Sequence, residues 1–401
     1  MDEALSRLVN AVRPLPATDG QRVSTFDALG RVLAEDVRSG LDVPPADNTS
    51  MDGYALRCAD VPVAGTVLPV SQRIPAGVIG APLMPGTVAR IFTGAQVPPG
   101  ADAVVMQEQC EPLGDGVRIN AAAQPGQWIR RRGEDVRQGA VVLTAGTRLS
   151  PQALGLAASV GAATLQVAAR PRVALFSTGD ELVMPGEPLK PGAIYNSNRF
   201  TLRALIQALG CECTDLGIVP DRLDATRDAL RKAAQGNHLI VTSGGVSVGE
   251  EDHLRPAVAA EGRIDLWQIA IKPGKPLAFG EVHRADRSSA HFIGLPGNPV
   301  SSFITFLLTV RPVLLRLQGA TELSPRGMTL RADFDWPRPD SRREFLRVRR
   351  NDQGGLDLFA NQSSGVLTSA VWGDGVVDNP GSHAIHLGDA VRFLPFSELL
   401  S

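Results

Sequence analysis

Between residues 171 and 318, short apolar runs alternate with amphipathic segments, a pattern typical of parallel strands joined by helices. The predicted strands are Val173–Phe176, Thr214–Val219, Leu239–Thr242, Leu266–Ile271 and Phe292–Leu295, and the predicted helices are Asn198–Leu209, Leu223–Gln235, His253–Ala260 and Val300–Leu317. Strands buried on both faces read as continuous apolar runs, as these do. The pattern therefore predicts a parallel, three-layer α/β domain over residues 171–318.

The N-terminal part follows different patterns. Its predicted elements are a helix at 3–13, a helix or helix–strand unit at 25–37, a helix at Pro151–Val160 and a strand at Ala163–Val167. From Val43 to Gln138, Pro and Gly are dense and Val or Ile alternates with polar residues, which is typical of a small all-β module. We therefore expect an elongated, discontinuous α/β domain of residues 1–43 and 139–170, interrupted by a β-rich domain at 44–138.

The C-terminal part alternates apolar and polar residues again. The clearest alternating runs are Arg343–Arg349, Gly355–Phe359 and Ala390–Phe393, and no helix of useful length is predicted. Short strands separated by turn residues favour a small β-barrel or sandwich over residues 321–401.

Length and composition limit the class of protein. A chain of 401 residues is too long for one ordinary core, and 43% apolar with 20% charged residues is typical of a globular fold. A net charge of −2 gives no overall bias toward nucleic acid or an anionic membrane. The longest apolar stretch, Val300–Leu315, contains Arg311 and Pro312 and is short for a bilayer span. Because the N-terminus is acidic and carries no secretory signal, we expect a cytoplasmic protein without nucleic-acid or membrane partners.

The cysteines and histidines do not form metal-binding motifs. Cys58, Cys110, Cys211 and Cys213 lack CxxC spacing, and the six histidines include no HxxxH or HExxH. These spacings predict reduced thiols and no zinc site.

One Gly-rich loop follows a predicted strand and precedes a predicted helix. Ser243-Gly244-Gly245 lets the backbone turn sharply and approach a ligand, and Asp252 stands where the next helix begins. Such a loop presents free N–H groups and a helix dipole to an anion. A tight turn with Asp252 as a simple helix cap explains the same residues.

Two further loops are rigid and polar. Only four of the 40 basic residues are lysine, yet Lys272 and Lys275 stand three apart in a loop stiffened by Pro273 and Pro276. The rigid frame indicates a fixed phosphate or oxyanion contact. In Gly294-Leu-Pro-Gly-Asn-Pro299, Asn298 fits a helix cap and Pro299 a first helical position.

Several of these polar segments follow predicted strands. They are Ser177–Glu181, Asp221, Ser243–Asp252 and Lys272–Lys275. Ligands of such sheets bind outside the carboxyl ends of the strands, so we expect these segments to converge there. Asp180, Glu181, Asp221 and Asp252 suit a hard cation such as Mg²⁺, although each also fits a turn or helix cap.

Seven motifs, taken in order, resemble one family. They are Ser50-Met-Asp-Gly-Tyr-Ala55, Ile91-Phe-Thr-Gly-Ala95, Gly133-Glu-Asp135, Ser177-Thr-Gly-Asp-Glu-Leu182, Thr242-Ser-Gly-Gly-Val-Ser-Val-Gly249 with Asp252, Ile271-Lys-Pro-Gly-Lys-Pro276 and Gly294-Leu-Pro-Gly-Asn-Pro299. Together they resemble the molybdopterin molybdenumtransferases, the MoeA family, which are similar to the C-terminal domain of gephyrin. The resemblance runs from about residue 5 to near the C-terminus.

The resemblance implies an activity and a site. Adenylylated molybdopterin and molybdate would be the substrates, Mg²⁺ the cofactor, and molybdenum cofactor with AMP the products. The implied catalytic residues are Asp52, Thr93, Asp135, Glu181, Asp221 and Asp252, of which Glu181, Asp221 and Asp252 would hold the metal. The implied substrate-binding residues are Thr178, Gly179, Asp180, Ser243, Gly244, Gly245, Ser247, Gly249, Lys272, Pro273, Lys275, Pro296, Asn298, Pro299, Arg342 and Ser364.

The resemblance also bears on less certain positions. On pattern alone, Asp52, Thr93 and Asp135 are turn residues, whereas the family places the matching positions at or near the cleft. Because family members are homodimers, these three would complete the pocket of the opposite subunit. The basic segment 326–350 fits a solvated face or an Arg342 or Arg343 contact to an oxyanion, and Ser341 stands where the family has Gly.

Two other functions fit parts of the chain. The 171–318 sheet resembles the small adenylyltransferases that make the adenylylated pterin, but these need no N-terminal extension or C-terminal β module. A gephyrin-like scaffold is the non-enzymatic alternative, and no disordered linker in the sequence supports it. Transient contacts with the adenylyltransferase and with cofactor-accepting proteins are further expectations.

Overall fold

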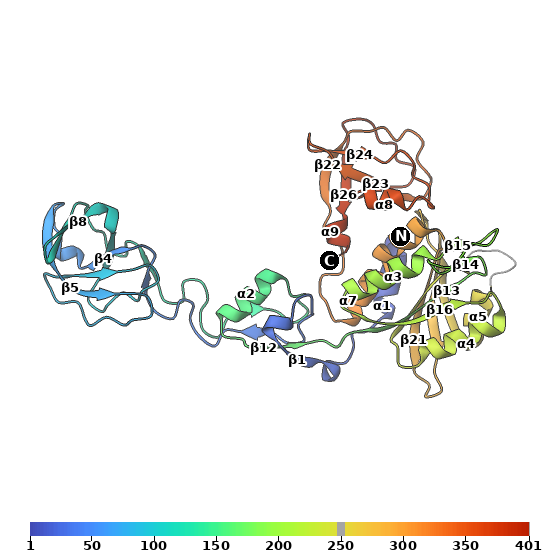
Figure 1. The fold of residues 1–401 in the computed structure, drawn as a ribbon, viewed down its shortest axis with the longest axis horizontal. Helices are drawn as coiled ribbons and strands as arrows, with labels where there is room; N and C mark the ends of the chain where they lie inside the picture. Colours follow the sequence, from blue (N-terminus) through green and yellow to red (C-terminus); the bar gives the residue numbers. More distant parts are fainter. Residues whose placement is uncertain (247–252, 401) are drawn as a thin grey trace.

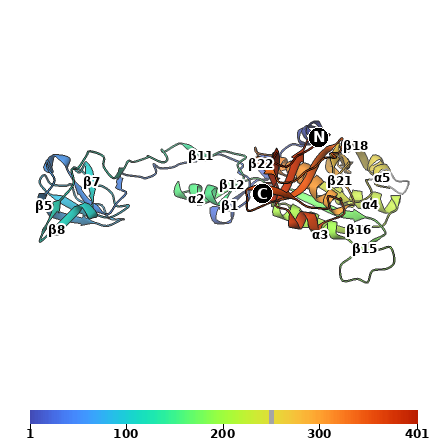
Figure 2. The same ribbon diagram turned by 90° about the horizontal axis from the view of Figure 1, so that it is seen from above.

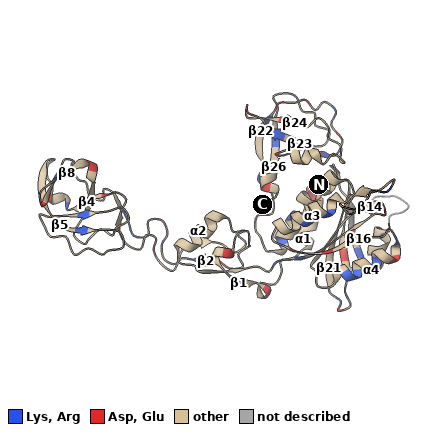
Figure 3. Cartoon of the chain, in the orientation of Figure 1, with Lys and Arg blue, Asp and Glu red and all other residues tan. Residues whose placement is uncertain are grey.

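The chain is drawn out along one axis. The computed structural model describes residues 1–246 and 253–400. Figures 1 and 2 show a β-rich unit around β4, β5 and β8 at one end, a small unit around α2 and β12 in the middle, and two larger bodies at the other end. Figure 3 marks acidic and basic residues along the chain, and neither kind fills a whole unit, in keeping with the net charge of −2.

A six-stranded sheet forms the largest body. Its strands, in the spatial order β16-β13-β17-β21-β20-β18, are β16 (Glu212–Val219), β13 (Arg172–Thr178), β17 (Leu239–Ser243), β21 (Ser289–Leu295), β20 (Pro276–His283) and β18 (Gly262–Gln268). The first four are mutually parallel, as predicted, whereas β20 and β18 are antiparallel to their neighbours. A small parallel pair, β14 (Leu182–Val183) and β15 (Ile194–Tyr195), lies in the loop after β13.

The predicted strand Leu266–Ile271 is wrong in its bounds, and the antiparallel strand β20 beside it was not predicted, but β18 runs in the same direction as the four parallel strands, as expected. The strand β18 ends at Gln268, and the separate two-residue strand β19 (Ile271–Lys272) pairs with another sheet. The link from β18 to β20 is too short for the crossover that a parallel pair requires, so the two strands form a hairpin. The lysine loop is the tip of that hairpin.

Helices cover both faces of this sheet. On one face lie α1 (Asp2–Ala11), α3 (Ser197–Ala208), α6 (Pro299–Thr305) and α7 (Arg311–Leu317), and on the other lie α4 (Leu223–Ala234) and α5 (Leu254–Glu261). Successive residues of a strand serve opposite faces, since Leu175 packs in the first core and Phe176 in the second. This alternation explains the continuous apolar runs, and the three-layer prediction is confirmed.

The last helix of the sheet domain is irregular. The predicted helix Val300–Leu317 is interrupted by a π-helical segment at Phe306–Val310, just before Pro312. Proline lacks an N–H and crowds the preceding turn, so a local widening there is expected. The stretch Pro299–Leu317 is long and apolar enough to cross a membrane, but 89% of it is buried inside the protein, which accounts for its composition.

The middle unit is held by non-local pairing. Strand β1 (Gln21–Ser24) pairs with β12 (Thr164–Val167), β2 (Val37–Arg38) pairs with β11 (Val141–Leu143), and α2 (Pro151–Ser159) packs beside them. The helix or helix–strand unit expected at 25–37 contains no α-helix: a 3₁₀ turn forms at Thr25–Asp27 and strand β2 begins at Val37. Val32 and Leu33 instead make isolated bridges to Arg148 and Val167, contacts that local sequence does not reveal.

The inserted unit is β-rich, as predicted. Its sheet has the order β7-β4-β6-β5-β9-β8. The strands are β4 (Gly53–Leu56), β5 (Thr66–Ile74), β6 (Val88–Ile91), β7 (Ala103–Met106), β8 (Cys110–Leu113) and β9 (Gly116–Ile119), with a separate pair of β3 (Asn48–Thr49) and β10 (Ile129–Arg130). Further 3₁₀ turns occur at Ala17–Asp19, Cys58–Asp60 and Gln107–Gln109.

The C-terminal part is a closed barrel. Its strands are β22 (Met328–Ala332), β23 (Arg343–Arg350), β24 (Gly355–Leu358), β25 (Gly375–Asn379) and β26 (Ala390–Pro395), with short helices α8 (Thr368–Trp372) and α9 (Phe396–Leu399). Because β23 pairs with both β24 and β25, the sheet closes on itself, and the predicted β-barrel is confirmed.

The four cysteines are free, and all are at least partly buried. Burial raises the pKa of Cys58 and Cys211 to about 12 and that of Cys110 and Cys213 to about 11. We therefore predict that alkylation of the native protein at pH 8 is about 100-fold slower than that of the unfolded chain, because the thiolate is the reacting form. Timed iodoacetamide labelling with mass spectrometry measures this, and rapid labelling of any one cysteine in the folded protein would contradict it.

Candidate active site

The carboxyl ends of the parallel strands meet at one edge of the sheet. There β13 ends at Thr178, β17 at Ser243 and β21 at Leu295, each followed by a glycine-containing loop. The Gly244 N–H donates to the Leu295 carbonyl at 3.1 Å, and the Ser177 and Ser243 hydroxyls lie 3.1 Å apart. These contacts join three loops that are distant in sequence, as the topology predicted.

Gly244 is required by the close approach of two loops. Its φ is +90°, and a Cβ at this position would lie 2.5 Å from the Thr178 carbonyl oxygen. Only glycine tolerates both conditions. The backbone of the Ser243-Gly244-Gly245 loop is therefore fixed against the end of β13.

Several polar atoms at this edge have no hydrogen-bond partner among the described residues. They are Thr178 Oγ1, Asn196 Nδ2, Thr242 Oγ1, Ser302 Oγ and Thr305 Oγ1, all on buried residues. Native proteins leave few buried polar atoms unpaired, so such a group of them is expected where a polar ligand binds. Asn198 has a different role, since its Nδ2 donates to the Gly297 carbonyl at 2.7 Å and fixes the loop after β21.

The loop after β21 contains Pro296, Asn298 and Pro299. Pro299 occupies the first turn of α6, as predicted, and Asn298 stands at the cap position without a side-chain cap hydrogen bond. The predicted capping role of the Asn298 side chain is therefore wrong. This side chain is exposed at the sheet edge.

Acidic side chains lie on the two neighbouring loops after β13 and β16. Asp180 Oδ1 accepts a hydrogen bond from the Asp221 N–H at 3.0 Å, which joins the loops. The Glu181 carboxylate folds back over Gly179, where a Cβ would meet Glu181 Oε2 at 2.5 Å. Among residues 1–246 and 253–400, no three His, Cys, Asp or Glu side chains are grouped as a metal site. Asp252, the third predicted metal ligand, lies outside the described residues, as do Ser247 and Gly249.

Oxygen ligands of the kind Mg²⁺ prefers are nevertheless present. Asp180 and Glu181 are exposed carboxylates at the strand ends, and Asp221 is one hydrogen bond away. The chemistry of this set fits a hard divalent cation shared with a phosphate ligand.

The lysine loop reaches the same edge from the hairpin. Residue Pro276 at the start of β20 pairs with Gln268, and β20 runs antiparallel to β21, so the hairpin tip lies beside the carboxyl end of β21. The Ile269 N–H donates to the Lys275 carbonyl at 3.0 Å and closes the tip. Lys275 is exposed and Pro273 is buried. The predicted convergence holds, because the loop follows β18, which runs in the same direction as β21, and turns back into β20 at this edge.

Lys272 connects the sheet domain to the barrel. Its Nζ lies 3.2 Å from Glu344 Oε1 and 3.5 Å from Asp340 Oδ2. Strand β19 also pairs with the start of β23, with Ile271 opposite Arg343 and Lys272 opposite Glu344. Asp340 and Glu344 were not predicted from the sequence, although both lie within two residues of the candidate Arg342.

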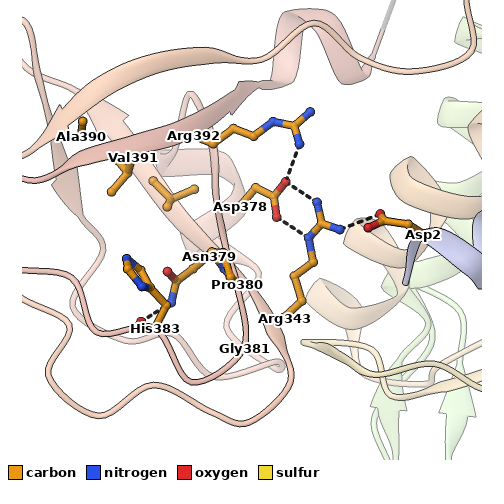
Figure 4. Close-up of a pocket in the computed structure, with 11 residues that line it drawn as sticks. Asp2, Arg343, Asp378, Asn379, Pro380, Gly381, His383, Ala390, Val391 and Arg392 are labelled. Atoms are coloured by element: carbon orange, nitrogen blue, oxygen red, sulfur yellow. Dashed lines mark hydrogen bonds and ion pairs between the residues drawn. The ribbon is translucent and has the colours of Figure 1, made fainter.

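Arg342 and Arg343 point to different sites. Arg342 donates to both oxygens of Asp340 at 2.8 Å, and its Nη1 lies 3.5 Å from the Ile271 carbonyl beside the lysine loop. Arg343 pairs instead with Asp378 and with Asp2 across a separate cavity of about 580 Å³ (Figure 4). Arg342 lies in the bend just before β23 and Arg343 is the first residue of that strand, and their side chains have different partners. Arg342 is therefore the one at the candidate site.

Ser364 lies on a barrel loop above α6. Its carbonyl accepts a hydrogen bond from the Val300 N–H at 3.0 Å, so the barrel contacts the first turn of this helix. Ser364 is half-buried at this junction. The structure thus brings the predicted residues of the sheet and the barrel together.

Asp52, Thr93 and Asp135 are not brought to this edge within one chain. Asp52 Oδ1 accepts from both the backbone N–H and the hydroxyl of Thr93, each at 2.7 Å, and these bonds lower the pKa of Asp52. The pair belongs to the unit of β4 and β6, far from β13 in both views (Figures 1 and 2). Asp135 is an exposed residue whose N–H donates to the Val43 carbonyl. Their role stays a prediction.

Family models match almost the whole chain. They are the MoeA N-terminal region (domain I and II) at 1–161, a probable molybdopterin binding domain at 174–316, and the MoeA C-terminal region (domain IV) at 329–396. This chain belongs to the MoeA family. It is 37% identical to a molybdopterin molybdenumtransferase of Haemophilus influenzae, over 100% of this chain and 99% of that protein. It is 36% identical to molybdopterin molybdenumtransferase 2 of Mycobacterium tuberculosis, over 94% and 93%.

The fold agrees with this membership. The crystal structure of the molybdopterin biosynthesis moeA protein from Pyrococcus horikoshii OT3 matches 98% of both chains with a TM-score of 0.84 and 29% identity. The family resemblance drawn from the motifs and the predicted fold class, an α/β multidomain protein with an inserted β-rich unit and a C-terminal barrel, are confirmed.

Proposed function

We propose that this protein inserts molybdate into adenylylated molybdopterin and cleaves the adenylate, giving molybdenum cofactor and AMP. The relatives named molybdopterin molybdenumtransferase support the transferase activity. The observation that carries the proposal here is that the glycine loops, the carboxylates and the lysine hairpin share one sheet edge.

The sheet edge suits the nucleotide-linked pterin. The fixed Ser243–Gly245 backbone and the unpaired polar atoms of Thr178 and Asn196 would take the polar groups of this substrate. Pro296, Asn298 and Pro299 form the neighbouring wall. The pterin dithiolene supplies the soft sulfur ligands for molybdenum, so the protein needs no cysteine at this site.

Molybdate would bind at the cationic end of the edge. Lys272, Lys275 and Arg342 provide ammonium and guanidinium donors, and Ser364 lies at the junction with the barrel. Arginine and lysine stabilise charge on an oxyanion most effectively where their positions are fixed beforehand. The paired strands β19 and β23 fix these positions.

Glu181, Asp221 and Asp252 would hold Mg²⁺, with Asp180 beside them. When bound, the ion would neutralise pyrophosphate charge during hydrolysis of the phosphoanhydride bond. Asp180 and Asp221 would keep the two loops in register through their mutual hydrogen bond. Chelation by EDTA should therefore abolish AMP release, and added Mg²⁺ should restore it.

A homodimer would complete the site. Phe26 has 95% of its surface exposed beside an apolar cavity of about 610 Å³ that is lined by Leu154, Gly155 and Ala158. An exposed aromatic side chain next to an apolar hollow fits a second copy of the same surface. The distant Asp52, Thr93 and Asp135 would then reach the sheet edge of the other subunit.

This surface gives a prediction. Phe26→Asp should weaken dimerisation by at least about tenfold, because the interface would then bury an unpaired charge. Light scattering after gel filtration over a concentration series measures the change. Val371→Asp, at another highly exposed apolar residue, on the barrel helix α8, is the matched control. An unchanged dimer in Phe26→Asp would contradict the assignment of this surface.

The decisive assay supplies adenylylated molybdopterin, Mg²⁺ and molybdate and measures AMP. Molybdate-dependent AMP supports the proposal, molybdate-independent AMP indicates simple hydrolysis, and no AMP overturns it. Pyrophosphate release from ATP and unadenylylated molybdopterin would instead support the adenylyltransferase reaction.

A further inference from the structure

Asp340 occupies the cationic end of the site. Its carboxylate accepts from the Arg342 N–H at 3.0 Å and from Arg342 Nε and Nη2 at 2.8 Å, and Lys272 Nζ lies 3.5 Å away. One carboxylate thus engages two of the three cations that the proposed function gives to molybdate. Its two oxygens contact the arginine fork in the bidentate manner of an oxyanion.

Glu344, the other carboxylate near Lys272, differs from Asp340 in its freedom to move. The Glu344 side chain is 1% exposed, and Trp336 Nε1 holds its Oε2 at 2.7 Å. The Asp340 side chain is 22% exposed, and its carboxylate contacts Arg342 and Lys272. Glu344 is therefore a fixed counter-ion, whereas Asp340 can release its partners by rotating.

The backbone contacts that position Asp340 and Lys272 do not involve the Asp340 carboxylate. The Ser382 N–H donates to the Asp340 carbonyl at 2.7 Å, and the pairing of β19 with β23 holds Lys272 beside the arginine strand. Lys272 also keeps its pair with Glu344. Loss of the Asp340 charge would therefore leave Lys272 and Arg342 near their positions.

We propose that Asp340 is a resident competitor for the oxyanion and sets the affinity of this site for molybdate. A tetrahedral dianion must take over the Arg342 fork and the Lys272 ammonium from the Asp340 carboxylate. Lys272, Lys275 and Arg342 carry three positive charges against two negative charges on Asp340 and Glu344, so removal of Asp340 makes the site more cationic. The inference rests on the proposed function, because it assigns the anion site to molybdate.

Protonation does not provide this release near neutral pH. The Arg342 side-chain hydrogen bonds hold the pKa of the Asp340 carboxyl well below its usual range, so Asp340 stays ionised. Displacement by the incoming anion is then the available route.

The test is titration of the full-length protein with molybdate alone by calorimetry. Asp340→Asn should bind molybdate about tenfold more tightly than wild type. A change of this size is expected when one electrostatic interaction of moderate strength is removed. Asp340→Glu keeps the charge and should remain within about twofold of wild type. Asp333→Asn is the matched control, because Arg331 engages Asp333 through the same bidentate contact elsewhere on the barrel.

The outcomes are separable from those of the AMP assay. Weaker or unchanged molybdate binding in Asp340→Asn, no binding by any of the proteins, or an equal gain in Asp333→Asn would overturn the inference. Tighter binding in Asp340→Asn without molybdate-dependent AMP release by wild type would support the anion site and refute the proposed reaction. In turnover, Asp340→Asn should lower the KM for molybdate, whereas a merely structural role would not.

Discussion

Lys272→Met should reduce molybdate-dependent AMP release by about 100-fold to 1,000-fold, the usual loss when one fixed donor to an oxyanion is removed. Lys272 is the ammonium that the hairpin tip holds between the sheet edge and the barrel. Methionine keeps most of the side-chain length but carries no charge. Steady-state kinetics with saturating adenylylated molybdopterin measures the loss.

A second effect must be separated from this one. Loss of Lys272 leaves the buried Glu344 carboxylate without its cation and should cost about 1–3 kcal/mol of folding free energy. The double variant Lys272→Met with Glu344→Gln should recover most of that stability in urea unfolding but stay inactive. Recovery of activity together with stability would mean that Lys272 serves only the fold. Lys232→Met, at an exposed residue of α4, controls for loss of a lysine as such.

Two inactive variants should restore activity when they share a dimer. Asp52→Ala lies in the inserted unit and Lys272→Met in the lysine hairpin. The inserted unit and the sheet domain that carries the hairpin are at opposite ends of the elongated molecule (Figure 1). If each site takes Asp52 from one subunit and Lys272 from the other, a mixed dimer has one intact and one doubly altered site. Co-expression in equal amounts should therefore yield about one quarter of wild-type activity, since half of the dimers are mixed.

Separate tags on the two subunits allow the mixed dimer to be purified and assayed alone. Its activity should approach half that of wild type per dimer, by the same count of sites. No activity in the mixed dimer would mean that Asp52 and Lys272 act within one subunit or that Asp52 has no catalytic role. Val371→Asp paired with Lys272→Met tests whether mixing alone changes the assay.

The sequence predicted the site best where short apolar runs and glycine turns mark the ends of parallel strands. The strand ends at Thr178, Ser243 and Leu295 follow from apolar runs and glycine turns, and the rule for parallel sheets was enough to predict that their loops meet. The lysine loop also follows a strand of the predicted direction, β18, but the antiparallel strand β20 after it was not predicted. The apolar run after the lysine loop is short, and periodicity alone does not assign so short a run.

Two other missed features depend on contacts between distant residues. Lys272 and Glu344 are paired across two domains, and neither residue's neighbours in sequence indicate the partner. The predicted helix in 25–37 fails for the same reason, because Leu33 pairs with Val167 far along the chain. Local propensity is a weak guide where burial against a remote strand decides the conformation.

The bond from the Val300 N–H to the Ser364 carbonyl has a consequence for how this protein distinguishes anions. Amides in the first turn of a helix ordinarily remain open to water or to a phosphate. Here the Val300 amide donates to another domain and is not available to an anion. Under the proposed function, cationic side chains would therefore make more of the contacts to the anion than backbone amides. Side chains can be exchanged one at a time without rebuilding a helix, so under the proposed function single substitutions among these cations should change the preference for one oxyanion over another.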